Sequence, residues 1–541
     1  MTKFRVSLRH FLWLATAVLF LTGCQLTNRL LQTGSDDPLT TYHIDRASAI
    51  ILSGGQPRTL DPTLTYGGPD DALGAIFSGL VTLDQQLQVQ PDLAAGWQIS
   101  EDRLVYTFYL RKNAVFHDGR PVTAQDVIFS WERAADPATS SDTAQTYLGD
   151  IAGVQEKLAG TAVAISGLRK IDDHTLEVRL TAPVVYFLEK LAYPVAFVVD
   201  QNNVTQADWE HHPNGTGPFT LQEWRDDEIL ILARNDYFYR EPAKISHLVY
   251  LLGPNLPLSL YEQDEIDLVG MGGDTLARVQ DPNDPLAADL RQTASLCTTS
   301  IGLNNRLAPL DDVRVRQALA YALDREKLVD IFWSDSGLLA SGALPPGMPG
   351  YGGVTQPLPY DPARARQLLA EAGYADPADL GTLTYYTAGY DTVDGLVTAV
   401  ITLWQETLGI TVEPVLIDPY TYNDQLYAGN IGHFFSSGWC ADYLDPQNFL
   451  DILYHSGSVQ NLSGYHSPLV DRMLERARTE PDVTARLALY ANVEQHLAED
   501  VPAIFLAHGV TAVLVKPRVQ NYVLTPLGIP QWHLVSVTSN Q

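Results

Sequence analysis

The stretch that decides the fold is a strand, a turn and a helix in direct succession: Leu104-Val-Tyr-Thr-Phe-Tyr-Leu110, His117-Asp-Gly-Arg-Pro121 and Thr123-Ala-Gln-Asp-Val127. The first segment is rich in β-branched and aromatic residues, which favour strands. The second carries the Asp, Gly and Pro residues typical of turns. Thr123 can cap the helix, with Asp126 three residues later as its capping-box partner. We therefore predict a strand-turn-helix unit here.

The same alternation continues along the chain. Residues 175–180 alternate polar and apolar side chains, as a half-buried strand does. Residues 361–373 begin with Asp361 and Pro362, end at Gly373, and have apolar residues at helical spacing between them. Strands and helices interleave from end to end, without a low-complexity linker after residue 42. We therefore predict an α/β fold whose domains share crossovers.

Composition excludes several classes of protein. The chain has 541 residues, of which 45% are hydrophobic and 18% are charged, so it is an ordinary globular protein with length for several domains. Its formal net charge is −29, with 35 Lys and Arg residues against 64 Asp and Glu residues. Such a polyanion is repelled by phosphate backbones, so we expect no nucleic-acid partner.

The N-terminus has the pattern of an export signal. Three basic residues precede an apolar run over residues 11–21, which is too short to span a bilayer, and small residues follow it. Leu21-Thr-Gly-Cys24 resembles the bacterial lipobox, in which the cysteine is lipidated. We expect a signal peptide over residues 1–23 and a lipid-anchored tether over residues 24–42. The protein would then be exported, either periplasmic or on the outer face of the cell membrane, and attached through Cys24.

Two cysteines remain after Cys24, namely Cys297 and Cys440. An exported compartment permits a disulfide between them, with two separate buried thiols as the alternative. The chain has no CxxC pair, His-rich run or HExxH motif, so we expect no metal site.

The usual motifs of enzymes are also missing. Gly270-Met-Gly-Gly273 lacks the strand and helix context of a dinucleotide fold, and no P-loop or GxSxG motif is present. We therefore expect neither catalysis nor a cofactor.

Several longer motifs resemble family 5 extracellular solute-binding proteins, the receptors of peptide and nickel ABC importers. These motifs extend from about residue 50 to beyond residue 514, so the resemblance covers nearly the whole mature chain. They include Leu93–Trp97, Phe116–Val127, Ile171–Val178, Gly215–Phe219, Asp312–Leu319 and Leu368–Tyr374.

The resemblance implies a two-lobed periplasmic binding protein of the type II, Venus-flytrap kind, with an extra subdomain in lobe I. The expected boundaries are residues 43–78, 205–296 and 508–541 for lobe I, 79–204 for the extra subdomain and 297–507 for lobe II. The family works with ABC permease subunits, and we expect a monomer.

Two further motifs, Leu296-Cys-Thr298 and Gly438-Trp-Cys-Ala-Asp-Tyr443, are similar to oligopeptide-binding members of the family, in which the two cysteines are joined. The resemblance therefore implies a Cys297–Cys440 disulfide within lobe II. It also implies a peptide lying extended between the lobes, with the site residues Asp442, Gly438, Trp439, Cys440, Tyr420, Gly67 and Gly68.

Each of these residues has an implied role. Gly438, Trp439 and Cys440 match the strand that pairs with the peptide backbone, and Gly67 and Gly68 match the facing segment. Asp442 matches the aspartate that binds the peptide ammonium; its alternative role is to cap a turn before Tyr443. Trp439 and Tyr420 match positions that line side-chain pockets, with core packing as their alternative.

The sequence departs from this pattern at the other end of the ligand. An arginine that meets the ligand carboxylate in oligopeptide-binding members is replaced by Ser436, Gly68 stands where a larger residue is found, and Tyr66 where an acid is found. His433 and His508 lie in segments near the expected cleft and are candidates to take over that contact.

Three alternatives remain at this level. The same fold can bind a non-peptide solute such as a nickel chelate, an oligosaccharide or an opine. The chain can also be an exported hydrolase on the same tether, or the sensor domain of a membrane signalling protein.

Overall fold

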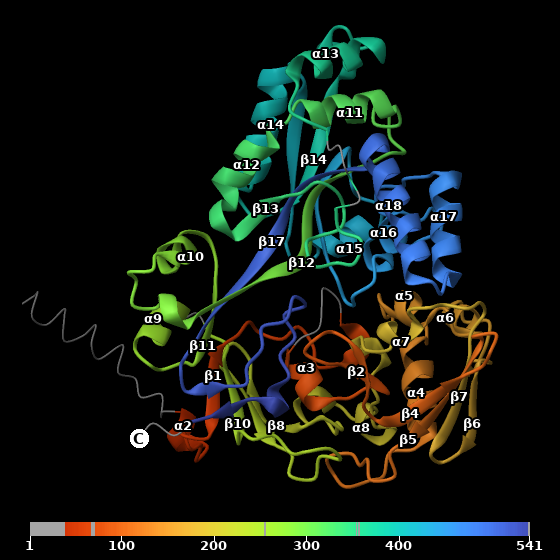
Figure 1. Cartoon of the computed structure of the whole chain (residues 1–541), viewed down its shortest axis with the longest axis vertical. Helices are drawn as coiled ribbons and strands as arrows, with labels where there is room; N and C mark the ends of the chain where they lie inside the picture. Colours follow the sequence, from red (N-terminus) through yellow and green to blue (C-terminus); the bar gives the residue numbers. More distant parts are fainter. Residues whose placement is uncertain (1–37, 66–70, 254–255, 353, 355–357, 539–541) are drawn as a thin grey trace, which may run out of the picture.

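The computed structural model describes residues 38–65, 71–253, 256–352, 354 and 358–538. Two lobes follow one another along the longest axis of the molecule (Figure 1). The predicted signal peptide and the lipidation residue Cys24 lie outside the described residues, as do Gly67 and Gly68.

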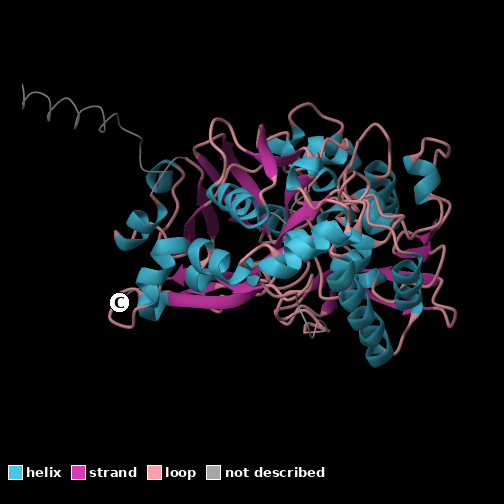
Figure 2. Ribbon diagram, turned by 90° about the horizontal axis from the view of Figure 1, so that it is seen from above, coloured by secondary structure: helices cyan, strands magenta, loops and turns pink. Residues whose placement is uncertain are grey.

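One eleven-stranded sheet runs through both lobes in the order β15-β14-β16-β12-β17-β11-β1-β10-β9-β8, with β13 paired to β17. Helices lie along it over much of its length (Figure 2). Its strands are β1 (Ala49–Ser53), β8 (Phe219–Arg225), β9 (Ile229–Arg234), β10 (His247–Leu251), β11 (Leu268–Met271), β12 (Leu290–Leu303), β13 (Gly337–Leu339), β14 (Thr382–Ala388), β15 (Thr411–Ile417), β16 (Phe434–Cys440) and β17 (Ala503–Val515).

The long antiparallel strands β12 and β17 cross from one lobe to the other (Figure 1). Their register is regular from Leu290 to Ala294, shifts between Ala294 and Thr298, shifts again between Thr299 and Ser300, and is regular from there to Gly302. Such an irregularity bends a strand pair locally. The boundary expected from the sequence, between residues 296 and 297, falls in this interval.

In lobe I the sheet is buried on both faces. Along β1, Ile50 and Leu52 belong to one apolar cluster, while Ala49 and Ile51 belong to another on the opposite face. This alternation is the period of two expected for a strand. The helices of this lobe are α3 (Asp71–Ile76), α8 (Gln201–Val204), α9 (Pro257–Glu262) and α10 (Gly273–Gln280), and two short strands, β18 (Val519–Gln520) and β19 (Ser536–Val537), lie near the C-terminus. The short helix α2 (Pro38–Thr41) lies at the end of the predicted tether, and its Leu39 packs against one of the same apolar clusters.

The extra subdomain has a four-stranded sheet of its own, in the order β4-β5-β7-β6, and its own apolar core. The predicted strand-turn-helix unit is confirmed, because β5 is followed by α4 and Asp126 accepts a hydrogen bond from the Thr123 amide at 2.8 Å. Its elements are β2 (Val81–Leu83), β3 (Val89–Pro91), β4 (Ala94–Ile99), β5 (Val105–Leu110), β6 (Leu168–Asp172), β7 (Thr175–Arg179), α4 (Ala124–Ala134), α5 (Ala144–Leu148), α6 (Val154–Leu158) and α7 (Phe187–Lys190).

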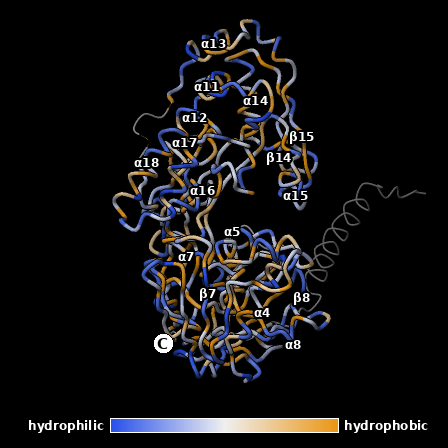
Figure 3. Tube along the Cα trace, turned by 90° about the vertical axis from the view of Figure 1, so that its right-hand side faces the viewer, coloured by the Kyte–Doolittle hydropathy of each residue, from blue (hydrophilic) through white to orange (hydrophobic). Residues whose placement is uncertain are grey.

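In lobe II, the strands β14, β15 and β16 are parallel, and β16 pairs antiparallel with β12. The predicted helix after Asp361 is confirmed, since the Asp361 carboxylate caps the amides of Ala363 and Arg364. The helices are α11 (Val313–Tyr321), α12 (Arg325–Phe332), α13 (Pro362–Glu371), α14 (Gly395–Leu408), α15 (Tyr422–Tyr427), α16 (Gln447–Tyr454), α17 (Pro468–Thr479) and α18 (Val483–Asp500). In Figure 3, α15 lies on the side of this lobe that is turned toward the other lobe.

Candidate ligand-binding site

Strand β16 has one edge that is only partly paired. Along one edge it pairs with β12 from Cys440 to Phe434. Along the other edge, β14 pairs with it only at Phe434 and Phe435. Among the described strands, none pairs with the remaining edge from Ser436 to Cys440, which we call the free edge.

The backbone groups of Gly438 and Cys440 point toward the free edge. Cys440 faces Cys297 with a Cα–Cα distance of 4.0 Å, which is the spacing of a pair that shares no backbone hydrogen bonds. The next residue, Ala441, donates its amide to Leu296 at 2.8 Å, as the alternation requires. Because the period is two, Gly438 and Ser436 have the same outward orientation as Cys440. The Ser436 carbonyl accordingly accepts a hydrogen bond from the Tyr422 hydroxyl at 2.8 Å.

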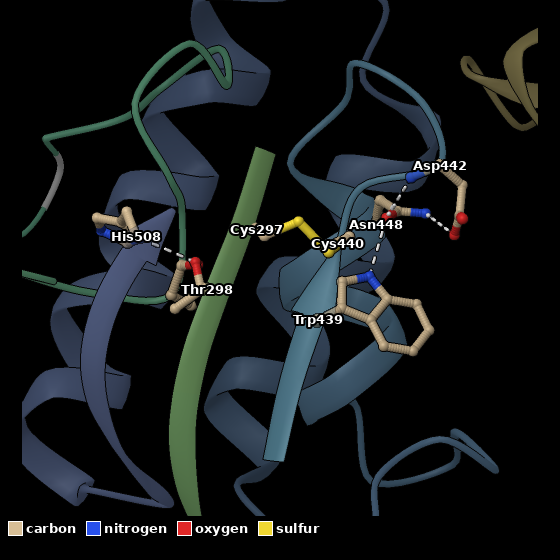
Figure 4. The surroundings of a disulfide bond; sticks show 8 residues. Cys297, Thr298, Trp439, Cys440, Asp442, Asn448 and His508 are labelled. Atoms are coloured by element: carbon tan, nitrogen blue, oxygen red, sulfur yellow. Dashed lines mark hydrogen bonds between the residues drawn. A yellow bond between two sulfur atoms is a disulfide. The ribbon is translucent and has the colours of Figure 1, made fainter. Parts of the chain in front are cut away.

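A disulfide joins Cys297 to Cys440 (Figure 4). It links β12 and β16 at the end of the free edge, and both strand segments belong to lobe II. The pairing implied by the family resemblance is therefore present, and it fixes the strand end from which Asp442 projects.

Asp442 is a buried acid without a cationic partner. Its exposed fraction is 9%, and in the described part of the chain no Lys, Arg or His forms an ion pair with it. Its Oδ2 accepts hydrogen bonds from the Tyr147 hydroxyl and from Asn448 Nδ2, the latter at 3.3 Å. Burial raises the pKa of the carboxyl group to about 6, although both hydrogen bonds favour the ionised form. A cationic ligand group would supply the missing charge.

Asn448, near the start of α16, holds the segment around Asp442 in place (Figure 4). Its Oδ1 accepts from the Asp442 amide at 3.1 Å and from Trp439 Nε1 at 3.0 Å. The Asn448 side chain is fully buried. One amide side chain therefore positions both the acid and the indole. We did not predict this residue from the sequence, and its only signal there is its spacing of six residues from Asp442.

Tyr147 reaches Asp442 from the extra subdomain. It lies on α5, and its ring stacks on Tyr193 with centroids 3.9 Å apart. Burial, together with the nearby Asp442 charge, raises the pKa of the Tyr147 hydroxyl well above its usual range, so the hydroxyl remains a donor at neutral pH. A second contact between the same parts runs from the Val185 amide to the Arg478 carbonyl, at 3.1 Å. The lobes thus meet at the buried acid.

A cavity of about 110 Å³ opens beside Asp442. Its walls come from lobe I, the extra subdomain and the C-terminal segment, and they include Phe77, Leu83, Tyr193, Phe197, Arg240 and Trp532. Arg240 lies 3.4 Å from the Asp92 carboxylate, which also accepts from the Tyr239 hydroxyl at 2.6 Å. Asp92 is therefore already paired, whereas Asp442 is not.

The other predicted site residues have different surroundings. Trp439 is half-buried and held by Asn448, whereas Tyr420 is 81% exposed and is therefore not a core residue. Burial lowers the pKa of both His433 and His508, to about 4 for the latter. His433 Nδ1 accepts the Thr384 amide at 3.1 Å, and His508 Nδ1 bonds to Thr298 Oγ1 at 2.9 Å. Both imidazoles are thus neutral at pH 7 and bonded through Nδ1, whereas the buried Nε2 of His508 has no hydrogen-bond partner among the described residues.

Two features are missing from the residues that the structure describes. No group of three or more His, Cys, Asp or Glu side chains there could hold a metal ion. Every helix there is too short or too polar to cross a membrane.

A continuous sheet that joins two lobes, with an unpaired strand edge and a buried acid where they meet, defines a two-lobed solute-binding protein. Comparison with known proteins agrees. The profile of the bacterial extracellular solute-binding proteins, family 5, matches residues 88–461. The chain belongs to this family.

Its relatives include peptide receptors. The chain is 32% identical to the periplasmic oligopeptide-binding protein OppA of Escherichia coli, over 90% of this chain and 92% of the relative. It is 33% identical to OppA of Salmonella typhimurium, with 91% and 92% covered.

Solved structures have the same architecture. The murein tripeptide-binding protein MppA of Escherichia coli superposes with a TM-score of 0.80 at 26% identity, covering 92% of this chain and 99% of MppA. Haemophilus influenzae OppA in complex with the peptide RPPGFSPFR gives 0.79 at 26% identity, covering 91% and 99%. The unliganded open form of MppA gives only 0.70, at 27% identity with 91% and 98% covered. The lobes here are therefore arranged less like that open form.

Proposed function

We propose that this protein is a lipid-anchored receptor that captures oligopeptides between its lobes and delivers them to the permease of an ABC importer. The observation that carries the proposal is the free edge of β16, which ends at a buried acid without a cation. A peptide of any sequence offers a backbone and an ammonium. The free edge can bind the backbone, and the buried acid Asp442 can bind the ammonium.

The direction of the ligand follows from this arrangement. Asp442 lies beyond Cys440, so the ammonium binds at the C-terminal end of β16, and the peptide then runs past Cys440 and Gly438 toward Ser436. It is antiparallel to β16. At about 3.3 Å per residue, the free edge accommodates about four ligand residues. Gly67 and Gly68 are proposed to pair with the opposite side of the peptide, and Trp439 and Tyr420 to line its side-chain pockets.

Closure of the lobes is proposed to follow ligand binding. The hinge is the irregular interval of β12 and β17, and the ligand favours the closed form because it contacts both lobes. Export through residues 1–23, lipidation of Cys24, a monomeric state and the domain boundaries given above belong to the same proposal. Relatives named as periplasmic peptide-binding proteins support it.

A non-peptide ligand is the second candidate. A relative 30% identical over 89% of this chain is named as a probable deoxycholate-binding protein, and another is a heme-binding protein. Neither name implies a ligand that carries an ammonium group. Asp442 therefore separates the two candidates.

The test is isothermal titration of the purified protein, from residue 25 onward, with trialanine to hexaalanine and with the same peptides acetylated at the amino end. We expect the free peptides to bind and the acetylated ones to lose at least about thirtyfold in affinity, because acetylation leaves the buried acid unpaired. No binding by folded protein, or equal binding of both forms, would refute the proposed recognition. Recovery of intact peptide afterwards distinguishes a receptor from a hydrolase.

A further inference from the structure

The part of lobe II that carries β16, residues 367–471, is strongly acidic; we call it the wall. Residues 367–471 contain 13 Asp and Glu residues but neither lysine nor arginine. This run builds β14, α14, β15, α15, β16 and α16. Arg364, Arg478 and Arg486, from outside the run, pair with three of its acids. The remaining negative charge is not balanced from within the wall.

Acids stand at the carboxyl end of each of its three parallel strands. Asp394 follows β14, Asp418 and Asp424 follow β15, and Asp442 follows β16. Carboxyl ends of neighbouring parallel strands meet at one edge of a sheet, where ligands of open α/β sheets bind. The acids therefore lie around the path that we propose for the ligand.

The helix N-termini at this edge do not attract an anion. Asp394 caps α14 by accepting the Leu396 amide at 2.8 Å, and Asp445 accepts the Gln447 amide at the start of α16 at 3.0 Å. Carboxylates of the chain itself thus occupy the positions that a ligand carboxylate would otherwise take.

The far end of the free edge is neutral. The Ser436 hydroxyl donates to Thr387 Oγ1 at 3.1 Å, and its carbonyl is held by Tyr422. His433 and His508 are uncharged and bonded through Nδ1, as described above. A ligand carboxylate at this end therefore meets hydroxyl groups and no fixed cation among the described residues of the edge.

The facing subdomain adds a like charge. Burial raises the pKa of the Asp142 carboxyl group, and the negative charge of Asp424 on α15 raises it further, against the opposing effect of Arg58. Burial, and to a smaller extent the Asp142 charge, also raises the pKa of the hydroxyl of Tyr427, which lies on α15. The two acids are thus close enough to repel each other, and the Arg58 charge offsets part of this repulsion.

We propose that the cleft reads the amino end of a peptide and selects against a free carboxylate near the paired segment, so that its preferred ligands carry a basic residue or an uncharged terminus there. This proposal rests on the peptide-receptor function proposed above. Serine at position 436 and the acids at the strand ends, Asp418 and Asp424, are the specificity-determining residues.

The experiment compares four peptides by isothermal titration: Ala-Ala-Ala-Ala-Lys and Ala-Ala-Ala-Ala-Glu, each with a free carboxylate and as the amide. At low ionic strength we expect the Lys peptide to bind on the order of tenfold more tightly than the Glu peptide, and each amide to bind several-fold more tightly than its acid. A Glu peptide that binds as tightly as the Lys peptide, or acids that bind as tightly as their amides, would overturn the inference but not the receptor function. If none of the four binds, the receptor function fails with it.

A double variant, D418N/D424N, identifies the source of the selectivity. The Asp418 carboxylate accepts the Tyr420 amide at 2.8 Å, and the side-chain oxygen of an asparagine can accept it equally, so the start of α15 should be retained. We expect the preference for Lys over Glu to fall at least threefold, while the affinity for the alanine pentapeptide amide changes little. The matched control is Asp379→Asn, which removes an exposed acid of the same run at the opposite end of β14. An equal loss of preference in this control, or none in the double variant, would contradict the assignment.

Discussion

The two ends of the free edge of β16 are built differently. At the Cys440 end, a disulfide fixes the strand, Asn448 orients an acid, and a tyrosine from the other lobe donates to that acid. At the Ser436 end, the edge itself presents hydroxyl groups and no buried charge, and the strand β14 closes it. The comparison teaches that the two ends discriminate by different means. The buried acid demands a cationic partner, whereas a neutral hydroxyl group does not and leaves selectivity to the acids at the neighbouring strand ends.

The largest expected effect comes from breaking the covalent link at the Cys440 end. Replacing Cys297 and Cys440 together by serine opens a loop of 143 residues. The loop-entropy relation gives a loss of about 4–5 kcal/mol in the free energy of unfolding. Urea denaturation of the ligand-free double variant measures it, with the Asp379→Asn variant as control. A change below about 1 kcal/mol would show that the disulfide contributes little.

The next effect separates the two ends directly. Asp442→Ala should cost about 2–5 kcal/mol in peptide binding, since the ligand ammonium would then be buried without a partner. The matched change at the other end, Ser436→Ala, should cost less than about 1 kcal/mol, because it removes one neutral hydrogen bond. Isothermal titration of both variants with tetraalanine measures the two losses in binding free energy. Equal losses at both ends would remove the distinction on which the comparison rests.

The pH dependence has opposite signs for stability and for affinity. Burial raises the pKa of Asp442 from 3.8 in the unfolded chain to about 6, so the ligand-free folded state binds more protons between these values. Its free energy of unfolding therefore falls as pH rises from about 4 to 6, by roughly 1–3 kcal/mol from this group. Peptide affinity instead rises over the same window, because the ammonium requires the ionised acid.

Thermal melts of the ligand-free protein and peptide titrations, each at pH 5 and pH 7.5, measure the predicted fall in stability and the predicted rise in affinity. Asp442→Asn should remove this part of the pH dependence. Glu189, whose pKa burial raises to about 7, remains in both proteins and cancels in the difference between them. Identical pH profiles of the two proteins would contradict the assignment to Asp442.

Much of this architecture can be predicted from the sequence. Capping residues such as Asp126 and Asp361 act within three residues, so a short window contains the whole interaction. Asp442 and the two cysteines could be located because they stand in long family motifs. Contacts between distant segments could not be predicted. Tyr147, for example, lies 295 residues from Asp442 and belongs to another domain. The absence of lysine and arginine from residues 367–471 can be read from the sequence, but its consequence depends on which strand ends lie at the same edge of the sheet.

The smallest expected effect concerns the contact across the lobes. Tyr147→Phe removes the hydroxyl donor that favours the ionised form of Asp442, so the pKa of the acid should rise further. At pH 7.5 we expect only a few-fold loss of peptide affinity, which grows as the pH falls toward 6. A loss that does not depend on pH would mean that Tyr147 acts by packing on Tyr193 alone.

A crystal structure of the protein with bound tetraalanine tests the central claim most directly. The account predicts the ligand ammonium within about 3 Å of the Asp442 carboxylate, with backbone hydrogen bonds to Gly438 and Cys440. A ligand that lies elsewhere, or an Asp442 that still bonds only to Tyr147 and Asn448, would contradict it.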